Sequence, residues 1–364
     1  MTTSPQLTLD WSETQKWIGQ ELLIEPRWGA DAVEMGTIRR ALEVIELGCP
    51  LHYDEKVAKQ HGFKTVVAPF HMLQVYATSA IWSPGEGTVW PTDDRNFTVA
   101  GTGRSGNVKR PPTHGSAGFV TDLAVEGYRP LVLGDRLKEV SYKLVSLMPR
   151  WTRVGEGAFM TWESVFEDQN GEKAGKVIMT TYSYVPAPSS GGGDQQGQQP
   201  AQGQERKPVK TDNPVADWSK QRYWEDVKDG EALPEVRYPL PLQRLVMAAG
   251  GIRDFNAIHH NTQVAQSGGA PEAYAMNYFI HGTWERVARE WIGLGGVIHK
   301  IGPFRMRVFN VTGDTMVVSG KVTRKYEEKG KKMVELELVT TSARGGHPTV
   351  GPGPVIVSLP SRKK

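Results

Sequence analysis

Three side chains that can hold a water molecule and move its protons lie within six residues of one another: Asp254, Asn256 and His259. Asp254 and His259 would be about 140° apart around an α-helix, and the alternation of a β-strand would send them to opposite faces. They can converge only if the chain bends between them. We therefore expect a loop that points both side chains into a cleft, since loops on a rigid scaffold commonly carry catalytic groups. The alternative is a solvated turn without a catalytic role.

The residues that follow extend this pattern. Ile258-His259-His260-Asn261 is followed by Ala265 and then by Phe279-Ile280-His281-Gly282. This arrangement resembles the signature of the MaoC-like (R)-specific enoyl-CoA hydratases, also called type 2 enoyl-CoA hydratases. The chain departs from that signature at Ala257, where the family usually has Pro, and in a Gly-rich insertion from Ser267 to Pro271.

The resemblance implies a role for each matching residue. Asp254 and His259 would be the catalytic pair, Asn256 a positioning amide, and Gly282 the backbone N–H donor to the thioester oxygen. The implied enzyme is a hydro-lyase that adds water to a 2-enoyl thioester, or removes water from a 3-hydroxyacyl thioester. The partner is an acyl-CoA substrate, and the chemistry needs no metal or redox cofactor. Which member of the pair acts as the base in hydration stays open.

The composition changes between residues 186 and 214, where Pro, Ser, Gly and Gln dominate. Such a segment buries too little apolar surface to offset the entropy lost on ordering, so it predicts a flexible linker. A chain of 364 residues is long enough for two domains. We place them at residues 8–185 and 215–360.

The two domains resemble divergent copies of one unit. Apolar residues recur at the spacing i, i+3, i+4, i+7 and i+8 in each: Leu73, Tyr76, Ala77, Ala80 and Ile81, then Trp284, Val287, Ala288, Trp291 and Ile292. This spacing predicts one amphipathic helix with one buried stripe in each copy. A His-containing segment precedes each predicted helix, with His52 in the first copy and His259 in the second.

Antiparallel strands are predicted after each helix. Asn170-Gly171 and Glu328-Lys329-Gly330-Lys331 have the composition of tight turns between two strands. A long helix followed by several antiparallel strands describes an α+β layer fold. It matches the hot-dog fold of the resembled family, and two copies predict a double hot-dog fold, with an antiparallel sheet wrapped around a long central helix in each copy.

The two copies differ in their chemistry. When His52 is aligned with His259, Leu47 and Cys49 stand where the second copy has its carboxylate and its amide. The first copy resembles the N-terminal dehydratase-like domain of double hot-dog MaoC proteins, and we expect it to be inactive and to shape the acyl pocket. Because the first copy lacks these catalytic side chains, it leaves space beside the acyl pocket, and we expect a substrate with a bulky or branched acyl group.

Two basic residues are candidates for binding coenzyme A. Arg305 and Arg307 are two positions apart, so they would share one side of a strand and could meet the phosphates of the coenzyme. The alternative is a solvated strand face.

Composition excludes several function classes. A net charge of +3, from 43 basic and 40 acidic residues, provides no electrostatic footprint for nucleic acid or an anionic membrane. A single cysteine, Cys49, permits no disulfide within the chain and fits a reducing compartment. We find neither a signal peptide between Met1 and Trp17 nor an apolar run of about 18 residues, so we expect a cytoplasmic protein. Two copies can pair within one chain, so a homodimer is allowed but not required.

Two other functions compete with the hydratase. A hot-dog acyl-CoA thioesterase would direct water at the thioester carbonyl instead of the double bond. A non-catalytic acyl-binding subunit of a larger complex would need no acid–base pair, and the presence of Asp254, Asn256 and His259 argues against it.

Overall fold

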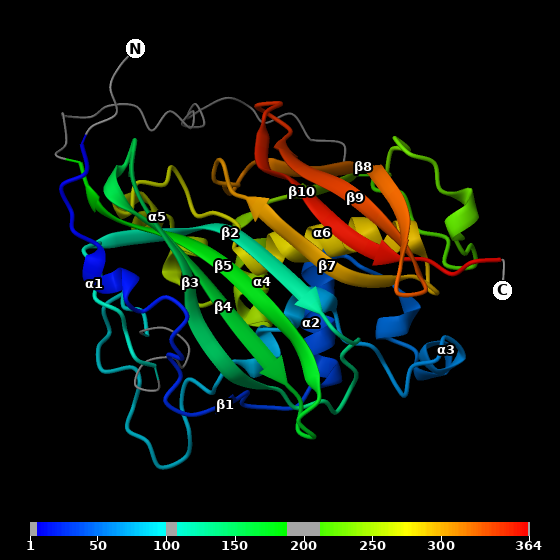
Figure 1. Ribbon diagram of the computed structural model, residues 1–364, viewed down its shortest axis with the longest axis horizontal. Helices are drawn as coiled ribbons and strands as arrows, with labels where there is room; N and C mark the ends of the chain where they lie inside the picture. The colour runs from blue at the N-terminus through cyan, green and yellow to red at the C-terminus, as the bar shows by residue number, and fades with distance from the viewer. Residues whose placement is uncertain (1–5, 100–107, 188–211, 363–364) are drawn as a thin grey trace.

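A computed structural model describes residues 6–99, 108–187 and 212–362 of the chain. Figure 1 shows a long, twisted sheet with the larger helices gathered on one of its faces. Most of the linker predicted at 186–214 lies outside the described residues. In the described parts of the chain, no helix is long and apolar enough to cross a membrane.

In the residues that the structure describes, ten strands form a single antiparallel sheet. The strands of the N-terminal half are β1 (Arg27–Trp28), β2 (Ala117–Gly127), β3 (Lys138–Thr152), β4 (Gly155–Glu167) and β5 (Lys173–Pro186). Those of the C-terminal half are β6 (Val236–Pro239), β7 (Val297–Arg305), β8 (Thr315–Glu328), β9 (Lys331–Ser342) and β10 (Pro348–Ser358). Their order is β1-β3-β4-β5-β2-β7-β10-β9-β8-β6, so corresponding strands take corresponding places from each edge, and β2 meets β7 in the middle.

Both predicted hairpins are confirmed. Asn170-Gly171 lies in the turn between β4 and β5, and Gly171 has a φ of 80°. Lys329 and Gly330, with φ values of 49° and 76°, connect β8 to β9. Positive φ values at both central residues give the turn a twist that matches the flanking strands.

The larger α-helices lie on one face of the sheet. The described residues form α1 (Ser12–Gln15), α2 (Met35–Ile45), α3 (Glu55–Gln60), α4 (Leu242–Ile252), α5 (Thr262–Ser267) and α6 (Asn277–Ile292). Helices α2, α4 and α6 contact one another on the same side of the sheet. The core between this layer and the sheet contains Trp284 of α6, whose indole N–H donates to the Thr340 hydroxyl at 2.8 Å.

The same local structure occurs once in each half. Helices α2 and α4 both have 11 residues, and each is followed by a residue in the left-handed conformation, Glu46 with a φ of 55° and Arg253 with a φ of 57°. A 3₁₀ turn comes next, η1 (Pro50–His52) in the first half and η5 (Ala257–His259) in the second. The six-residue helices α3 and α5 follow at the same spacing.

Equivalent side chains begin these two short helices. The Asp54 carboxylate accepts hydrogen bonds from the backbone N–H groups of the first turn of α3, and the Asn261 amide oxygen does the same for α5. Such caps satisfy donors that an α-helix leaves free at its start. The repeat inferred from the sequence is therefore a repeat of backbone geometry.

The long helix predicted at Leu73–Ile81 is wrong. The chain instead forms two 3₁₀ turns, η2 (Phe70–Met72) and η3 (Val75–Ala77), and Thr78 is already extended. Leu73, Tyr76 and Ala77 are buried as expected, but over so few residues the same spacing also fits successive 3₁₀ turns. Within the described residues, the long central helix of a hot-dog fold is present in the C-terminal half alone.

Helix α6 is also more buried than its sequence pattern predicts. Thirteen of its 16 residues are buried, including Glu285, Arg286 and Arg289, which we expected on a polar face. The N-terminal half covers that face, and each of the three charges has partners there or within the C-terminal half. The prediction of a single buried stripe is therefore wrong.

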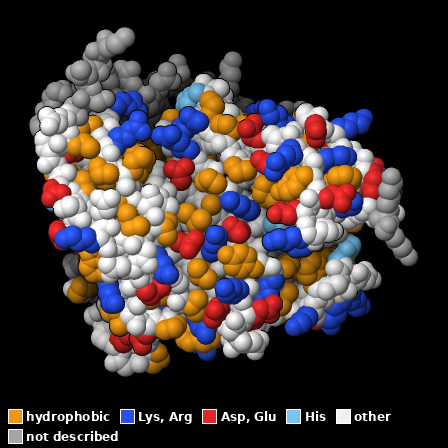
Figure 2. All heavy atoms as spheres, in the orientation of Figure 1, with side chains coloured by type: hydrophobic (Ala, Val, Ile, Leu, Met, Phe, Trp, Pro, Cys, Tyr) orange, Lys and Arg blue, Asp and Glu red, His pale blue; other side chains and the backbone are white. Residues whose placement is uncertain are grey.

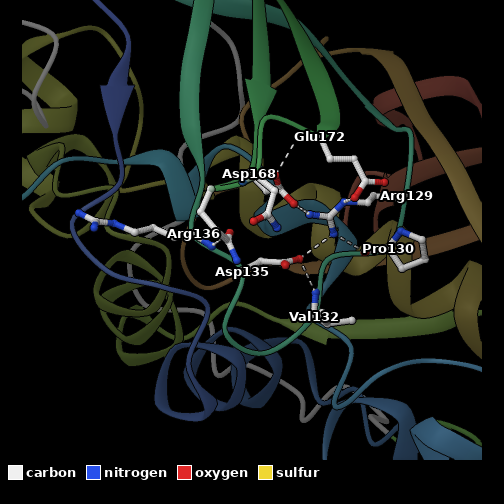
Figure 3. Close-up of polar contacts among 9 residues, drawn as sticks. Arg129, Pro130, Val132, Asp135, Arg136, Asp168 and Glu172 are labelled. Atoms are coloured by element: carbon white, nitrogen blue, oxygen red, sulfur yellow. Dashed lines mark hydrogen bonds and ion pairs between the residues drawn. The ribbon is translucent and has the colours of Figure 1, made fainter.

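A buried cluster of charges joins two loops of the N-terminal half (Figure 3). The Arg129 guanidinium donates to Asp135 and to Asp168 at 2.7 Å each. Asp135 also accepts from the backbone N–H of Val132, and Asp168 from that of Glu172. The cluster thus ties the connection between β2 and β3 to the hairpin between β4 and β5.

We expect Arg129→Met to lower the free energy of unfolding by about 2 to 3 kcal/mol, because it leaves two largely buried carboxylates without their cation. Chemical denaturation measures this change. The matched control is Arg136→Met, whose exposed side chain should cost less than about 1 kcal/mol. Equal losses in the two variants would contradict the assignment.

Candidate active site

The segment after α4 brings Asp254 and His259 together. The left-handed Arg253 turns the chain, the Asp254 N–H donates to the Ala249 carbonyl at 3.1 Å, and η5 carries His259 back towards the carboxylate. Asp254 Oδ2 lies 3.6 Å from His259 Nε2. At this distance both atoms can contact one small molecule between them without bonding directly to each other.

The imidazole of His259 is held by its other nitrogen. Nδ1 lies 2.8 Å from the backbone carbonyl of Tyr274, so Nδ1 carries the proton and donates it to that oxygen. Burial lowers the pKa of His259, while the Asp254 charge opposes this shift. A neutral ring in this tautomer presents the lone pair of Nε2 to the carboxylate side.

Asp254 and His259 differ in their exposure to solvent. The Asp254 side chain is 32% exposed, whereas the His259 side chain is 9% exposed. The carboxylate can therefore meet incoming water or substrate, and the imidazole forms the inner wall of the site. Such a pairing of an open carboxylate with a buried neutral imidazole suits the transfer of protons to and from a shared water.

Asn256 holds the loop and does not face the pair. Its side-chain oxygen accepts a hydrogen bond from the Ile258 N–H at 3.3 Å, and its own N–H lies 3.4 Å from Asp254 Oδ1. The amide is exposed. It therefore begins the turn that positions His259, which is a smaller role than contact with a substrate.

Tyr274 is a residue of the site that the sequence analysis missed. Its ring meets the His259 ring edge to face, with centroids 5.2 Å apart, and packs on Phe309. Burial and then the charge of Asp254 raise the pKa of Tyr274 to about 12. The phenol thus keeps its proton and remains a hydrogen-bond donor near the carboxylate.

The expected role of Gly282 does not fit its position. Gly282 is the sixth residue of α6, where a backbone N–H pairs with the carbonyl four residues earlier. A methyl group on it would lie 3.0 Å from His71 Nε2 and 3.2 Å from Ile45 Cγ2. The glycine therefore permits close packing against the N-terminal half, and its position inside the helix does not support the oxyanion donor expected at this residue.

The first turn of α6 lies five residues earlier. An α-helix leaves its first N–H groups without partners inside the helix, and α6 begins at Asn277. Asn277 follows three residues after Tyr274, whose carbonyl binds His259. The positive end of the helix dipole adds to the attraction of these donors for a developing negative oxygen.

Segments of the N-terminal half border the site. Arg253 donates to the Ser79 carbonyl at 3.0 Å, and the Asn261 amide donates to the Asn96 side chain at 2.7 Å. Tyr278 donates its hydroxyl hydrogen to the side-chain oxygen of Gln74. The Asp254–His259 pair therefore lies at the junction between the two halves of the chain.

The structure does not bring Arg305 and Arg307 to the Asp254–His259 pair. Phe304 packs on His281 and Trp284 of α6, so its neighbour Arg305 points to the opposite face of the sheet. There Arg305 lines a groove beside Asp122. Figure 2 shows this outer face, where acidic, basic and hydrophobic side chains are interspersed. Arg307 lies beyond the end of β7, and its Nε donates to the Gly351 carbonyl.

The N-terminal copy keeps the histidine frame without the carboxylate. His52 Nδ1 lies 2.8 Å from the Val67 carbonyl, which matches the bond between His259 and Tyr274. Leu47 and Cys49 are buried, and burial raises the pKa of the Cys49 thiol to about 11. Among the described residues, no group of three or more His, Cys, Asp or Glu side chains is placed to hold a metal ion.

The start of α6 had no clear signal in the sequence. Met276 precedes the helix and makes no side-chain cap, and the apolar spacing becomes regular only from Trp284. The spacing between His52 and Val67 offered an indirect signal, because it recurs between His259 and Tyr274. The start of the helix follows from that repeat. The contact itself has no signal in the sequence, because the backbone carbonyls of Val67 and Tyr274 make it and their side chains do not.

One curated relative supports the resemblance in sequence. No protein-family model matches the chain. A protein from Thermomonospora curvata named "Probable enoyl-CoA hydratase alpha subunit" is 32% identical over 164 residues, which are 43% of this chain and 46% of that protein. The match thus spans about half the length of that relative.

Solved structures confirm the predicted fold. A MaoC-like dehydratase superposes with a TM-score of 0.64 over 96% of this chain and 100% of its own, at 17% identity. A conserved hypothetical protein from Mycobacterium tuberculosis with a double hotdog fold superposes with a TM-score of 0.55 over 94% of this chain and 96% of its own, at 11% identity. The chain therefore has the double hot-dog fold of MaoC-like dehydratases, with the N-terminal long helix replaced by 3₁₀ turns.

The hydrogen bond to Tyr274 predicts the tautomer of His259. We expect a neutral ring at pH 7 with the proton on Nδ1 and a lone pair on Nε2, because burial lowers the pKa of this residue. Long-range ¹H–¹⁵N correlation spectra of histidine-labelled protein measure the tautomer, and His259→Gln assigns the signal. A proton on Nε2 would contradict the geometry.

His281 predicts a loss of stability in acid. It is fully buried and packs on Phe304, and burial lowers its pKa from 6.5 to about 3. Between these values the unfolded chain binds a proton that the folded protein does not, so the unfolding free energy falls as the pH decreases from 6.5 to 3. One such proton contributes a slope of about 1.4 kcal/mol per pH unit. Denaturation at a series of pH values should give a flatter slope for His281→Leu, and an unchanged slope would refute the assignment.

Proposed function

We propose that this protein, which has the double hot-dog fold of MaoC-like dehydratases, hydrates the double bond of a 2-enoyl-CoA thioester or dehydrates the 3-hydroxyacyl product. The observation that carries the proposal is the approach of Asp254 and His259 to 3.6 Å, with the imidazole held by the carbonyl of Tyr274, three residues before α6 begins. The relative from Thermomonospora curvata is named for the same class of reaction, which adds support.

His259 is the base in the hydration direction. Its Nε2 accepts a proton from a water as the water oxygen bonds to the β-carbon, and the Asp254 carboxylate binds the other hydrogen of that water. Asp254 also stabilises the imidazolium that forms, across 3.6 Å. The proton then passes to the α-carbon, so the reaction is balanced without another reactant. A positioned acid–base pair of this kind contributes about 10² to 10⁴-fold.

The first turn of α6 receives the negative oxygen. While water adds to the β-carbon, negative charge develops on the thioester oxygen. The backbone N–H of Asn277, at the positive end of the helix dipole, is the donor for it. Preorganised donors of this type contribute about 10² to 10³-fold. Asn277 thus takes the role expected at Gly282.

The acyl group is bulky or branched. The N-terminal half has only short 3₁₀ turns where the C-terminal half has the 16-residue α6. It contributes the segment around Ser79 and Asn96 to the border of the site. A site bordered by such a segment admits more varied substrates than one closed by a second long helix. The competent site is in the C-terminal half.

Asp254→Asn and His259→Gln test the proposal. Each should lower kcat for hydration of a 2-enoyl-CoA by at least about 10²-fold, because each removes one half of the acid–base pair. The measurement is the loss of conjugated enoyl absorbance, over a panel of thioesters of increasing bulk. Asp229→Asn and His61→Gln, both on exposed residues, are the matched controls and should keep normal rates.

The same assay separates hydration from thioester cleavage. A hydratase consumes the enoyl chromophore and releases no free thiol, whereas a thioesterase releases coenzyme A. Wild-type hydration by folded Asp254→Asn protein would refute the assigned pair. Release of thiol with the chromophore intact would refute the reaction itself.

A further inference from the structure

The side chain of Tyr274 is larger than its backbone role requires. The Tyr274 carbonyl accepts from His259 Nδ1 at 2.8 Å, and in the N-terminal copy the Val67 carbonyl lies at the same distance from His52 Nδ1. Each of these two residues comes 15 positions after its histidine, and each makes one isolated antiparallel bridge with a later segment. Because a valine is sufficient for this backbone arrangement, the ring of Tyr274 serves another purpose.

The ring of Tyr274 packs directly on the imidazole of His259. The two ring centroids are 5.2 Å apart and the ring planes meet at 83°. The tyrosine ring also packs on Phe309, with centroids 4.4 Å apart, so it is itself held in place. A hydrogen bond at Nδ1 alone leaves the imidazole free to rock about that bond, and the ring contact limits this movement.

The ring also covers His259 on the side of an open site. The Asp254 carboxylate beside the imidazole is 32% exposed, whereas the His259 side chain is 9% exposed. Tyr274 is half-buried, so its ring lies between the imidazole and the solvent. It thereby contributes to the exclusion of water from His259.

The ring acts on His259 through burial and not through charge. Burial has the largest effect and lowers the pKa of His259, the Asp254 carboxylate raises it, and His260 lowers it. The phenol of Tyr274 is neutral, because burial and then the charge of Asp254 raise its pKa to about 12. Removal of the ring therefore changes the burial of His259 and leaves the charges that face it unchanged.

We propose that Tyr274 is a positioning residue for the hydration reaction: its ring holds the His259 imidazole with Nε2 towards the reacting water and keeps other water away. This role rests on the proposed function and acts through His259, without contact with the substrate. The copy that has the carboxylate thus has an aromatic ring at Tyr274, where the copy without the carboxylate has Val67.

Tyr274→Val and Tyr274→Phe separate the ring from the hydroxyl. Tyr274→Val introduces the residue of the other copy, and we expect it to lower kcat for hydration of a 2-enoyl-CoA up to about tenfold, with KM unchanged within about twofold. Tyr274→Phe keeps the ring and should keep kcat within about twofold. Tyr128→Val, on an exposed tyrosine, is the matched control and should keep wild-type rates. An equal loss of kcat in Tyr274→Phe and Tyr274→Val would overturn the assignment to the ring.

The ionisation of His259 provides a second readout that needs no substrate. In histidine-labelled Tyr274→Val protein, NMR titration should show the proton still on Nδ1 and a pKa that rises towards 6.5, because water reaches the imidazole. The acidic limb of kcat/KM should move to higher pH by the same amount, and Tyr274→Phe should restore both values. An unmoved or lower pKa, or loss of the Nδ1 proton, would overturn the positioning role.

The two readouts distinguish this proposal from the proposed reaction. A wild-type protein that hydrates no 2-enoyl-CoA would refute the reaction, while the NMR titration would still measure the effect of the ring on His259. Normal hydration by the wild type together with an unmoved His259 pKa in Tyr274→Val would refute the positioning role alone.

Discussion

The Glu285 carboxylate connects the two halves of this protein. It is fully buried on α6, and it accepts hydrogen bonds from the N–H groups of Phe70 and His71 and from the His71 ring at 2.6 Å. Burial alone would raise the pKa of Glu285, but these donors bring it down to about 2, so the group stays charged. A buried charge is stable only with such partners. The position of the N-terminal 3₁₀ turns therefore depends on a residue of the other half.

This interaction is one reason why two similar scaffolds present different polar groups. Both halves repeat one helix length, one left-handed residue and one histidine held by a backbone carbonyl. In the C-terminal half, the carboxylate of Asp254 faces that histidine and the first N–H groups of α6 have no helical partners. In the N-terminal half, Leu47 replaces the carboxylate and Glu285 occupies the corresponding N–H groups. The backbone sets where a reaction can occur, and a few side chains decide whether it does.

Part of this arrangement was predictable from the sequence. Turn residues such as Gly171 are determined locally, because the turn requires a positive φ that glycine adopts readily. The proximity of Asp254 and His259 follows from their short separation and the need for a bend. The burial of Glu285 was not predictable, since it depends on Phe70 and His71, which are more than 200 residues away in the chain. The position of Gly282 differs from the expectation for a related reason: the absence of a side chain there permits a contact between halves, whereas the local motif indicated a helix start.

The repeat in sequence suggests two independent domains, but the packing argues against independent folding. β2 pairs with β7 to continue one sheet across the boundary, and α6 is buried on nearly every side. Without the N-terminal half, Glu285 would lose its three donors, and the face of α6 next to Gly282 would lose the close contact with His71. A hot-dog unit needs a helix to cover its sheet, and the described N-terminal half has 3₁₀ turns in place of that helix. The two halves therefore share one central helix, and the segment that carries Asp254 and His259 contacts both of them.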